Sequence, residues 1–378
     1  MEKVNWKIII SISVLCIFGI ISLWTVAPLV PDKEPIKQTF FKQLVFMLIS
    51  TIVLLALLLP SYRYAKRGCY IFYFIILVLL IYVTITGKDI KGASRWIPIG
   101  PFMLQPSEFM KLAIVLALAR FMMYQKNIST IKGLIGPFIL AVVPMAIVLK
   151  QPDLGTAIIF FPVLLAMVYV AGAKVRHIIV ILLLCAISIP AIYTFVLKDY
   201  QRERFLSFIM PSKVEHDKRY HQDQAIKVIG AGKILGTGLG EGMLTEPYYV
   251  PERHTDSIFT VIGEGTGFIG STILLICFIV LLYQSLLIAY STREPFGKLI
   301  ATGMTTFLAI QVIINVGMNI GVAPITGITL PFVSYGGSSL LTNFIAVALI
   351  LNVGIHYVPT FSGRDFGYEK DRIGGILT

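Results

Sequence analysis

The stretch that decides the fold is Pro251-Glu252-Arg253-His254-Thr255-Asp256, followed at once by an apolar run from Ser257 to about Tyr290. Four ionisable side chains are crowded at the start of a segment that is apolar enough to lie in a lipid bilayer. A carboxylate at the mouth of a membrane helix is costly to hold unless it is paired, solvated or used. We therefore expect the rest of the chain to bring other charged residues to Asp256.

The composition predicts an all-α polytopic membrane protein with about ten transmembrane helices. The chain of 378 residues is 56% hydrophobic and only 14% charged, which excludes an ordinary soluble domain. Apolar runs recur along its whole length, so we expect one membrane domain over 1–378. The predicted spans, soft by several residues at each end, are 8–27, 41–59, 69–86, 107–124, 134–150, 154–173, 177–197, 256–290, 298–319 and 338–356.

Basic residues are more frequent in the loops that lie inside if the N-terminus is cytoplasmic. An even number of helices then puts both termini in the cytoplasm, with 357–378 as a cytoplasmic tail. The large loop 198–255, between the seventh and eighth helices, lies outside. In a membrane protein the net charge of +12 reflects cytoplasmic loops and anionic lipid rather than nucleic acid. The four cysteines lack metal-ligand spacing, so no metal site is predicted from them.

Three outside stretches, 92–108, 151–155 and 323–339, are rich in Gly and Pro and do not resemble simple linkers. Non-helical backbone at membrane depth is tolerated only where protein covers it or it lines a cavity. By topology all three emerge on the same side as Asp256. In the large loop, 220–227 predicts a short amphipathic helix, and the glycine-rich run 230–242 predicts turns that fold the loop over the membrane surface.

Each candidate site residue has a structural interpretation beside the functional one. Asp256 could be a helix N-cap together with Thr255, although a cap does not need the charges around it. Glu108 and Lys111, at i and i+3, could be a structural ion pair or could line an outward cavity. Asp153 could cap the sixth helix.

Two further sets of residues remain open in the same way. Arg95 and Trp96 could anchor lipid headgroups, or could recognise a diphosphate and a sugar or isoprenoid. Arg202 belongs to a basic stretch of the large loop, which could simply be solvated. Gln311, Asn315 and Asn319 form a polar stripe on the ninth helix, which predicts interhelical hydrogen bonds.

Five ordered motifs, spread over nearly the whole chain, resemble the SEDS family (shape, elongation, division and sporulation). They are GASRWIPIGPFMLQPSEFMKLA, KQPDLGTA, DYQRERF, PERHTDSIFTVIGE and PITGITLPFVSYGGSS. The sequence is most similar to the elongation branch, RodA, with the division branch, FtsW, as the close rival. It departs from the family pattern after the HTD triplet, where Ser257 stands for Phe, and at Glu264-Gly265, where the family has two Glu.

The resemblance implies a GT-C-like fold and a peptidoglycan glycosyltransferase in the bacterial plasma (inner) membrane, with its active site facing outside. The implied substrate is lipid II, a disaccharide-pentapeptide on undecaprenyl diphosphate. The implied partners are a class B penicillin-binding protein, which crosslinks the product, and other membrane proteins of the elongation complex. No nucleic acid is expected.

The residues fit that chemistry. An inverting displacement of a diphosphate by a sugar hydroxyl needs one general base, for which Asp256 is the candidate. Arg95, Lys111 and Arg202 could stabilise the leaving diphosphate; no cofactor is predicted outright, but a divalent cation, Mg²⁺ or Mn²⁺, could supply the same charge. Glu108 and Asp153 would orient these cations. The other substrate-binding candidates that the resemblance implies are Trp96, His254, Thr255 and Ser338.

Other classes of function stay open at this point. A lipid II flippase or another transporter would share the helices and the charged cavity, but its polar residues should continue toward the cytoplasmic half. A scaffold without chemistry would not need three irregular segments around one carboxylate. An acyl or phosphoryl transferase lacks support from any Ser/His or metal-ligand pattern.

Overall fold

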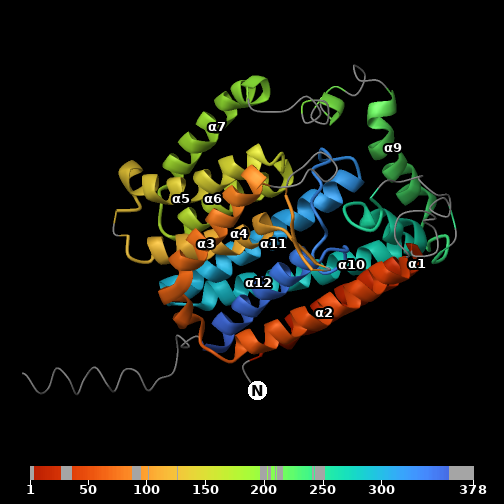
Figure 1. Cartoon of the computed structure of the whole chain (residues 1–378), viewed down its shortest axis with the longest axis horizontal. Helices are drawn as coiled ribbons and strands as arrows, with labels where there is room; N and C mark the ends of the chain where they lie inside the picture. The colour runs from red at the N-terminus through yellow and green to blue at the C-terminus, as the bar shows by residue number, and fades with distance from the viewer. Residues whose placement is uncertain are drawn as a thin grey trace, which may run out of the picture.

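The structure is a computed structural model, and it describes residues 4–26, 36–86, 95–100, 102–125, 127–195, 202, 206–208, 210, 216–240, 242 and 252–356. These residues are almost entirely helical (Figure 1). The helices are α1 (Trp6–Val26), α2 (Ile36–Leu58), α3 (Ala65–Thr86), α4 (Pro106–Met122), α5 (Ile131–Lys150), α6 (Leu154–Val170), α7 (Val175–Phe195), α9 (His216–Ala231), α10 (Ile258–Ser291), α11 (Pro295–Asn319) and α12 (Gly337–His356). The short elements are the 3-10 turn η2 (Tyr62–Tyr64) and the antiparallel strands β1 (Ile97–Ile99) and β2 (Phe102–Leu104).

A helix is present at each of the ten predicted spans, so the predicted element order is confirmed. Within the described ranges, 7 helical stretches are long and apolar enough to cross a membrane, and α6 and part of α7 are shorter apolar helices. The chain is therefore an all-helical, multi-pass membrane protein. The predicted tail 357–378 lies outside the described residues.

The centre of the bundle is formed by α4, α11 and α12, which lie in the middle of Figure 1. In the most apolar stretch of each helix, 67% of the residues are buried in α11 and 78% in α12, but only 11% in α2. Side chains on α2 are therefore available to lipid, while those on the central helices contact protein. The helix α7 stands at the edge of the bundle, and its main contacts are with α6.

The longest helix, α10, is broken at Gly267 (φ 63, ψ −159). The sequence predicted a single span over 256–290, whereas the 34 residues of α10 form two helical parts on either side of this break. A positive φ of this kind is accessible to glycine at little cost. A Cβ at Gly267 would also lie 2.3 Å from the backbone nitrogen of Gly236, so a larger residue does not fit.

The glycine-rich part of the large loop fills this break. The N–H of Phe268 donates to the carbonyl of Lys233 (2.9 Å), and the N–H of Ile269 donates to the carbonyl of Ile234 (3.1 Å). The loop thus supplies hydrogen-bond partners that the interrupted helix cannot provide for itself. Residues 232–238 pack into the side of α10 rather than only covering a surface, and the predicted helix at 220–227 is part of the longer α9.

Candidate active site

Arg95 holds the turn between α5 and α6. Its Nε donates to the carbonyl of Gln151 (2.9 Å), a second guanidinium nitrogen donates to the carbonyl of Pro152, and Nη1 lies 3.7 Å from Oδ1 of Asp153. Asp153 caps α6 by accepting from the N–H of Thr156 (3.2 Å), and its Oδ2 accepts from the hydroxyl of Thr156 (3.0 Å). The predicted cap at Asp153 is therefore confirmed. In the described residues the guanidinium of Arg95 contacts protein groups, which leaves its direct contact with a diphosphate a prediction.

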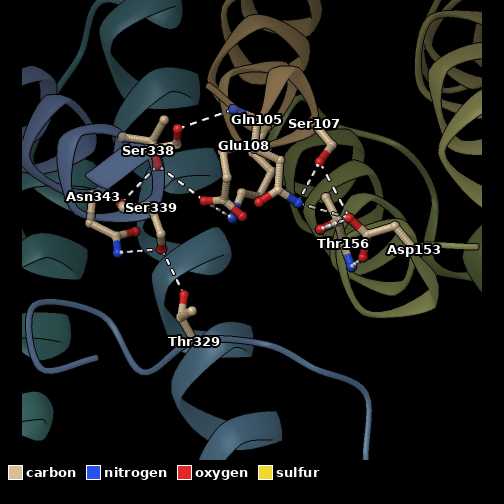
Figure 2. A network of polar contacts seen from close by, with 11 residues as sticks. Gln105, Ser107, Glu108, Asp153, Thr156, Thr329, Ser338, Ser339 and Asn343 are labelled. Carbon is tan, nitrogen blue, oxygen red and sulfur yellow. Dashed lines mark hydrogen bonds and ion pairs between the residues drawn. The ribbon is translucent and has the colours of Figure 1, made fainter. Parts of the chain in front are cut away.

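Gln105, between the β-hairpin and α4, connects this turn to the start of α12 (Figure 2). Its side-chain Nε2 donates to Oδ2 of Asp153 (3.2 Å), and its backbone N–H donates to the hydroxyl of Ser338 (3.1 Å). The Ser338 hydroxyl donates in turn to the carbonyl of Met103 (3.1 Å). Figure 2 shows these side chains converging from α4, α6 and α12. We call the whole set the polar network: Arg95, Gln105, Ser107, Glu108, Lys111, Asp153, Thr156, Thr329, Ser338, Ser339, Thr342 and Asn343.

Glu108 and Lys111 form the ion pair that their spacing predicted, with Nζ 2.8 Å from Oε2. The side chains are only 8% and 1% exposed, so the pair is buried in the bundle. Thr342 of α12 donates to Oε2 of Glu108 (3.3 Å), and the Lys111 ammonium lies 4.8 Å from the centre of the Phe307 ring on α11. The pair thus joins the three central helices.

Asp256 lies in the turn 252–257 that leads into α10. The N-cap residue of α10 is Ser257, and its side chain makes no capping hydrogen bond. The alternative that Asp256 serves as the N-cap is therefore wrong. The Asp256 carboxylate instead faces the segment 323–336, since a Cβ placed on Gly327 would lie 3.3 Å from Oδ2. The carboxylate therefore lies beside the irregular backbone of that segment.

His254 and Thr255 fix the same turn through their backbone. The N–H of Tyr335 donates to the carbonyl of His254 (3.0 Å), and the Ser334 hydroxyl donates to the carbonyl of Thr255 (2.6 Å). The Thr255 hydroxyl donates to the carbonyl of Glu252 (3.3 Å) within the turn. The residues 254–256 are therefore held against the segment 323–336 by two adjacent residues, Ser334 and Tyr335.

The segment 323–336 also reaches the polar network. A Cβ on Gly155, at the start of α6, would lie 2.6 Å from the Thr326 carbonyl oxygen, so glycine allows the two backbones to touch. The hydroxyls of Thr329 and Ser339 are 2.7 Å apart (Figure 2). The described parts of the three irregular stretches and Asp256 therefore lie at one end of the bundle, as their topology predicted.

Two predicted site residues are not joined to this arrangement by the contacts described. Arg202 donates to the carbonyl of Thr194 and lies 6.0 Å from the Tyr193 ring, both near the end of α7. Trp96 is half-buried beside β1. Their roles in binding remain predictions.

Sequence reasoning missed Gln105 and the buried Arg253, which is 4% exposed. Burial lowers the pKa of the Arg253 guanidinium from its ordinary value. A buried cation three residues before Asp256 is a further candidate to attract an anionic group. The signal for Gln105 was a polar residue between apolar ones, and the signal for Arg253 was its place among the crowded ionisable residues before Asp256. Among the described residues, no group of three or more His, Cys, Asp or Glu is placed to hold a metal ion, so we derive no step through one.

This fold and site define a class of protein: a multi-pass helical membrane bundle in which buried charged side chains and the Asp256 carboxylate gather at one end. The family described as "Cell cycle protein", which groups FtsW, RodA and SpoVE, matches residues 3–357. The chain belongs to this family, which is the SEDS family.

Its relatives carry names from several branches. Stage V sporulation protein E of Bacillus subtilis is 35% identical over 340 residues, covering 88% of this chain and 92% of that protein. The peptidoglycan glycosyltransferase MrdB of Escherichia coli is 37% identical over 269 residues, covering 71% and 73%. Other matching relatives are named probable peptidoglycan glycosyltransferase FtsW. The identities therefore do not separate the elongation branch from the division branch.

Solved structures of the family are similar to this chain. A chain from a peptidoglycan synthase complex, described as coordinating polymerisation and crosslinking, has a TM-score of 0.79 and 29% identity over 93% of this chain and 97% of that chain. The crystal structure of the rod shape determining protein RodA of Thermus thermophilus has a TM-score of 0.69 and 26% identity over 93% and 96%. An aspartate-to-alanine mutant of that RodA gives the same TM-score.

Proposed function

We propose that this protein is a peptidoglycan glycosyltransferase that polymerises lipid II during cell elongation, with Asp256 as general base. The observation that carries the proposal is the placement of the Asp256 carboxylate against Gly327, at the end of the bundle where the polar network lies. Relatives named as peptidoglycan glycosyltransferases support the reaction class. The assignment to elongation rests on the motifs DYQRERF and PERHTD, which resemble the elongation branch.

The reaction would be a single inverting displacement. The Asp256 carboxylate accepts the proton of the acceptor hydroxyl as its oxygen attacks the anomeric carbon of the donor sugar. The bond from that carbon to the diphosphate breaks, and undecaprenyl diphosphate leaves with the electron pair. Arg253, Lys111, Arg95 and Arg202 are the cations from which its stabilisation would come.

The distribution of polar residues on α4 favours an enzyme over a transporter. On α4, the buried residues that follow Lys111 are apolar through Ala119. A substrate path across the membrane would need polar groups continuing through that region. The polar network instead stays at the end of the bundle that carries Asp256.

The partner in this proposal is a class B penicillin-binding protein, which would crosslink the strands that this chain makes. Its support is the similarity to a chain of a peptidoglycan synthase complex. The proposed location is the bacterial plasma membrane, with the polar network and Asp256 facing outside and both termini inside.

One experiment separates the two classes of function. The full-length protein is reconstituted in vesicles with lipid II, with and without the partner, and glycan strands and lipid II translocation are measured on the same samples. We expect strands to form, at a higher rate with the partner. Translocation without strand formation in either sample would favour the transporter.

A further inference from the structure

We propose that Asn315 is a positioning residue for Asp256. Asn315 fixes both the direction of the Asp256 side chain and the position of the backbone of the segment 323–336 that faces it. The inference rests on the proposed role of Asp256 as the base. It concerns a single amide on α11 that is completely buried (0% exposed). The sequence predicted only that this residue forms interhelical hydrogen bonds.

The side-chain amide of Asn315 uses both of its donor positions. Nδ2 donates to the carbonyl of Asp256 (2.9 Å) and to the carbonyl of Ile328 (2.6 Å). An amide NH₂ has two hydrogens, so one side chain can bridge two carbonyls. Asp256 precedes α10 and Ile328 belongs to the segment 323–336, so this one amide holds together two segments that are distant in the sequence.

The contact with Asp256 limits where its carboxylate can point. The peptide group after Asp256 is held through its carbonyl by Asn315, and the peptide group before it is held through the Thr255 carbonyl by Ser334 (2.6 Å). Peptide groups are planar, so the two planes on either side of a Cα determine φ and ψ. Fixing both planes therefore fixes the direction of the Cα–Cβ bond of Asp256.

The contact with Ile328 positions the backbone that faces the Asp256 carboxylate. Gly327, the residue before it, has φ +73, and a Cβ there would lie 3.3 Å from Oδ2 of Asp256. The residue after it, Thr329, contacts Ser339 of the polar network. Asn315 thus sets the separation between the carboxylate and the backbone that leads to the polar network.

Two neighbours on the same stripe of α11 provide comparisons. Asn319 also donates to the Asp256 carbonyl (3.1 Å), but its other described bonds go to Asn315 rather than to the segment 323–336. Gln311, one turn before Asn315, is also 0% exposed, and neither polar atom of its side chain has a hydrogen-bond partner in the described residues. Gln311→Leu is therefore a matched control: it removes a buried amide from the same helix without removing a described hydrogen bond.

The test uses the full-length protein with purified lipid II, and compares wild type with Asn315→Leu, Asn315→Ala, Asn319→Leu, Gln311→Leu and Asp256→Ala. The readouts are kcat and KM for polymerisation, lipid II binding measured directly, and the apparent Tm. Asn315→Ala loses the amide donors without adding bulk or a buried charge, so it covers the case in which Asn315→Leu does not fold.

We expect the Asn315 variants to lose about 10- to 100-fold in kcat, because a misplacement of about 1 Å can cost 100-fold. KM and lipid II binding should change by no more than about twofold, as expected when ground-state binding is preserved. Asn319→Leu should lose less, and Gln311→Leu should remain near wild type.

Each other outcome counts against a stated claim. If the Asn315 variants match Gln311→Leu while Asp256→Ala is inactive, the positioning role is wrong and the base assignment stands. If they lose lipid II binding in parallel with kcat, Asn315 has a general structural role and the inference is again wrong. If Asp256→Ala polymerises lipid II normally, both the base and its positioning residue are overturned.

Discussion

Breaking the Glu108–Lys111 pair from one side should destabilise the protein more than replacing both residues together. The two side chains are 8% and 1% exposed and their charged atoms are 2.8 Å apart. Removing one partner of a buried ion pair leaves an uncompensated charge, which costs about 3–5 kcal/mol. An apolar pair of similar volume avoids that penalty, so Glu108→Leu with Lys111→Met should recover much of the loss.

The size of the effect can be worked out for thermal unfolding. With an unfolding entropy of about 2.1 cal/mol/K per residue, a loss of 3–5 kcal/mol lowers the Tm of a chain of this length by roughly 4–6 °C. The apparent Tm of wild type, both single variants and the double variant in detergent gives the double-mutant cycle. We expect a coupling energy of about 1–3 kcal/mol.

The Lys66–Glu294 pair is the matched control, because its side chains are 22% and 24% exposed. A pair with that access to solvent should show a coupling energy of at most about 1 kcal/mol. Additive effects of the Glu108 and Lys111 substitutions would refute the pairing. A coupling energy no larger than that of the control pair would refute the role of burial.

Three further predictions concern other parts of the chain. Burial raises the pKa of Glu294, but hydrogen bonds from Lys66 and the Gly297 N–H outweigh burial and lower the pKa below 4.5. The contribution of the Glu294 carboxylate to folding stability should therefore be complete at pH 7 and disappear as the pH falls through the lowered pKa. The difference in Tm between wild type and Glu294→Gln, measured at pH 7 and below pH 4.5, checks this. Gly267→Ala should cost about 1–3 kcal/mol of stability and increase hydrogen exchange in 232–238. The control Gly230→Ala, at a position with open space around it, should do neither. Equal Tm values for the two variants would contradict the account of the break in α10. Hydrogen exchange in 198–255 should change when the partner binds, and unchanged exchange with raised polymerisation would place activation elsewhere.

The helices could be predicted because lipid imposes a simple requirement. A segment that spans a bilayer must satisfy its own backbone and present apolar side chains, so each span is visible as an apolar run. The break in α10 was not visible in this way. A glycine in a long apolar run predicts no particular φ, and the hydrogen-bond partners at Gly267 come from a distant loop.

The candidate site could be predicted in part for a related reason. Spacing alone indicated the Glu108–Lys111 pair, because residues three apart on a helix share a face. The capping role of Asp153 followed from its place before a helix. The bonds from Asn315 to Asp256 and Ile328 join segments far apart in the chain, and no local pattern encodes such a contact.

The central claim is that the carboxylate of Asp256 accepts the proton in glycosidic bond formation, and a single-turnover measurement tests it most directly. Wild type, Asp256→Asn and the control Asp223→Asn, on α9 of the same loop, are saturated with lipid II, and the rate of the first bond is followed together with lipid II binding. The account predicts that Asp256→Asn binds lipid II normally but forms the bond about 10²- to 10⁴-fold more slowly, while Asp223→Asn matches wild type. A bond-forming rate near wild type in Asp256→Asn would contradict it.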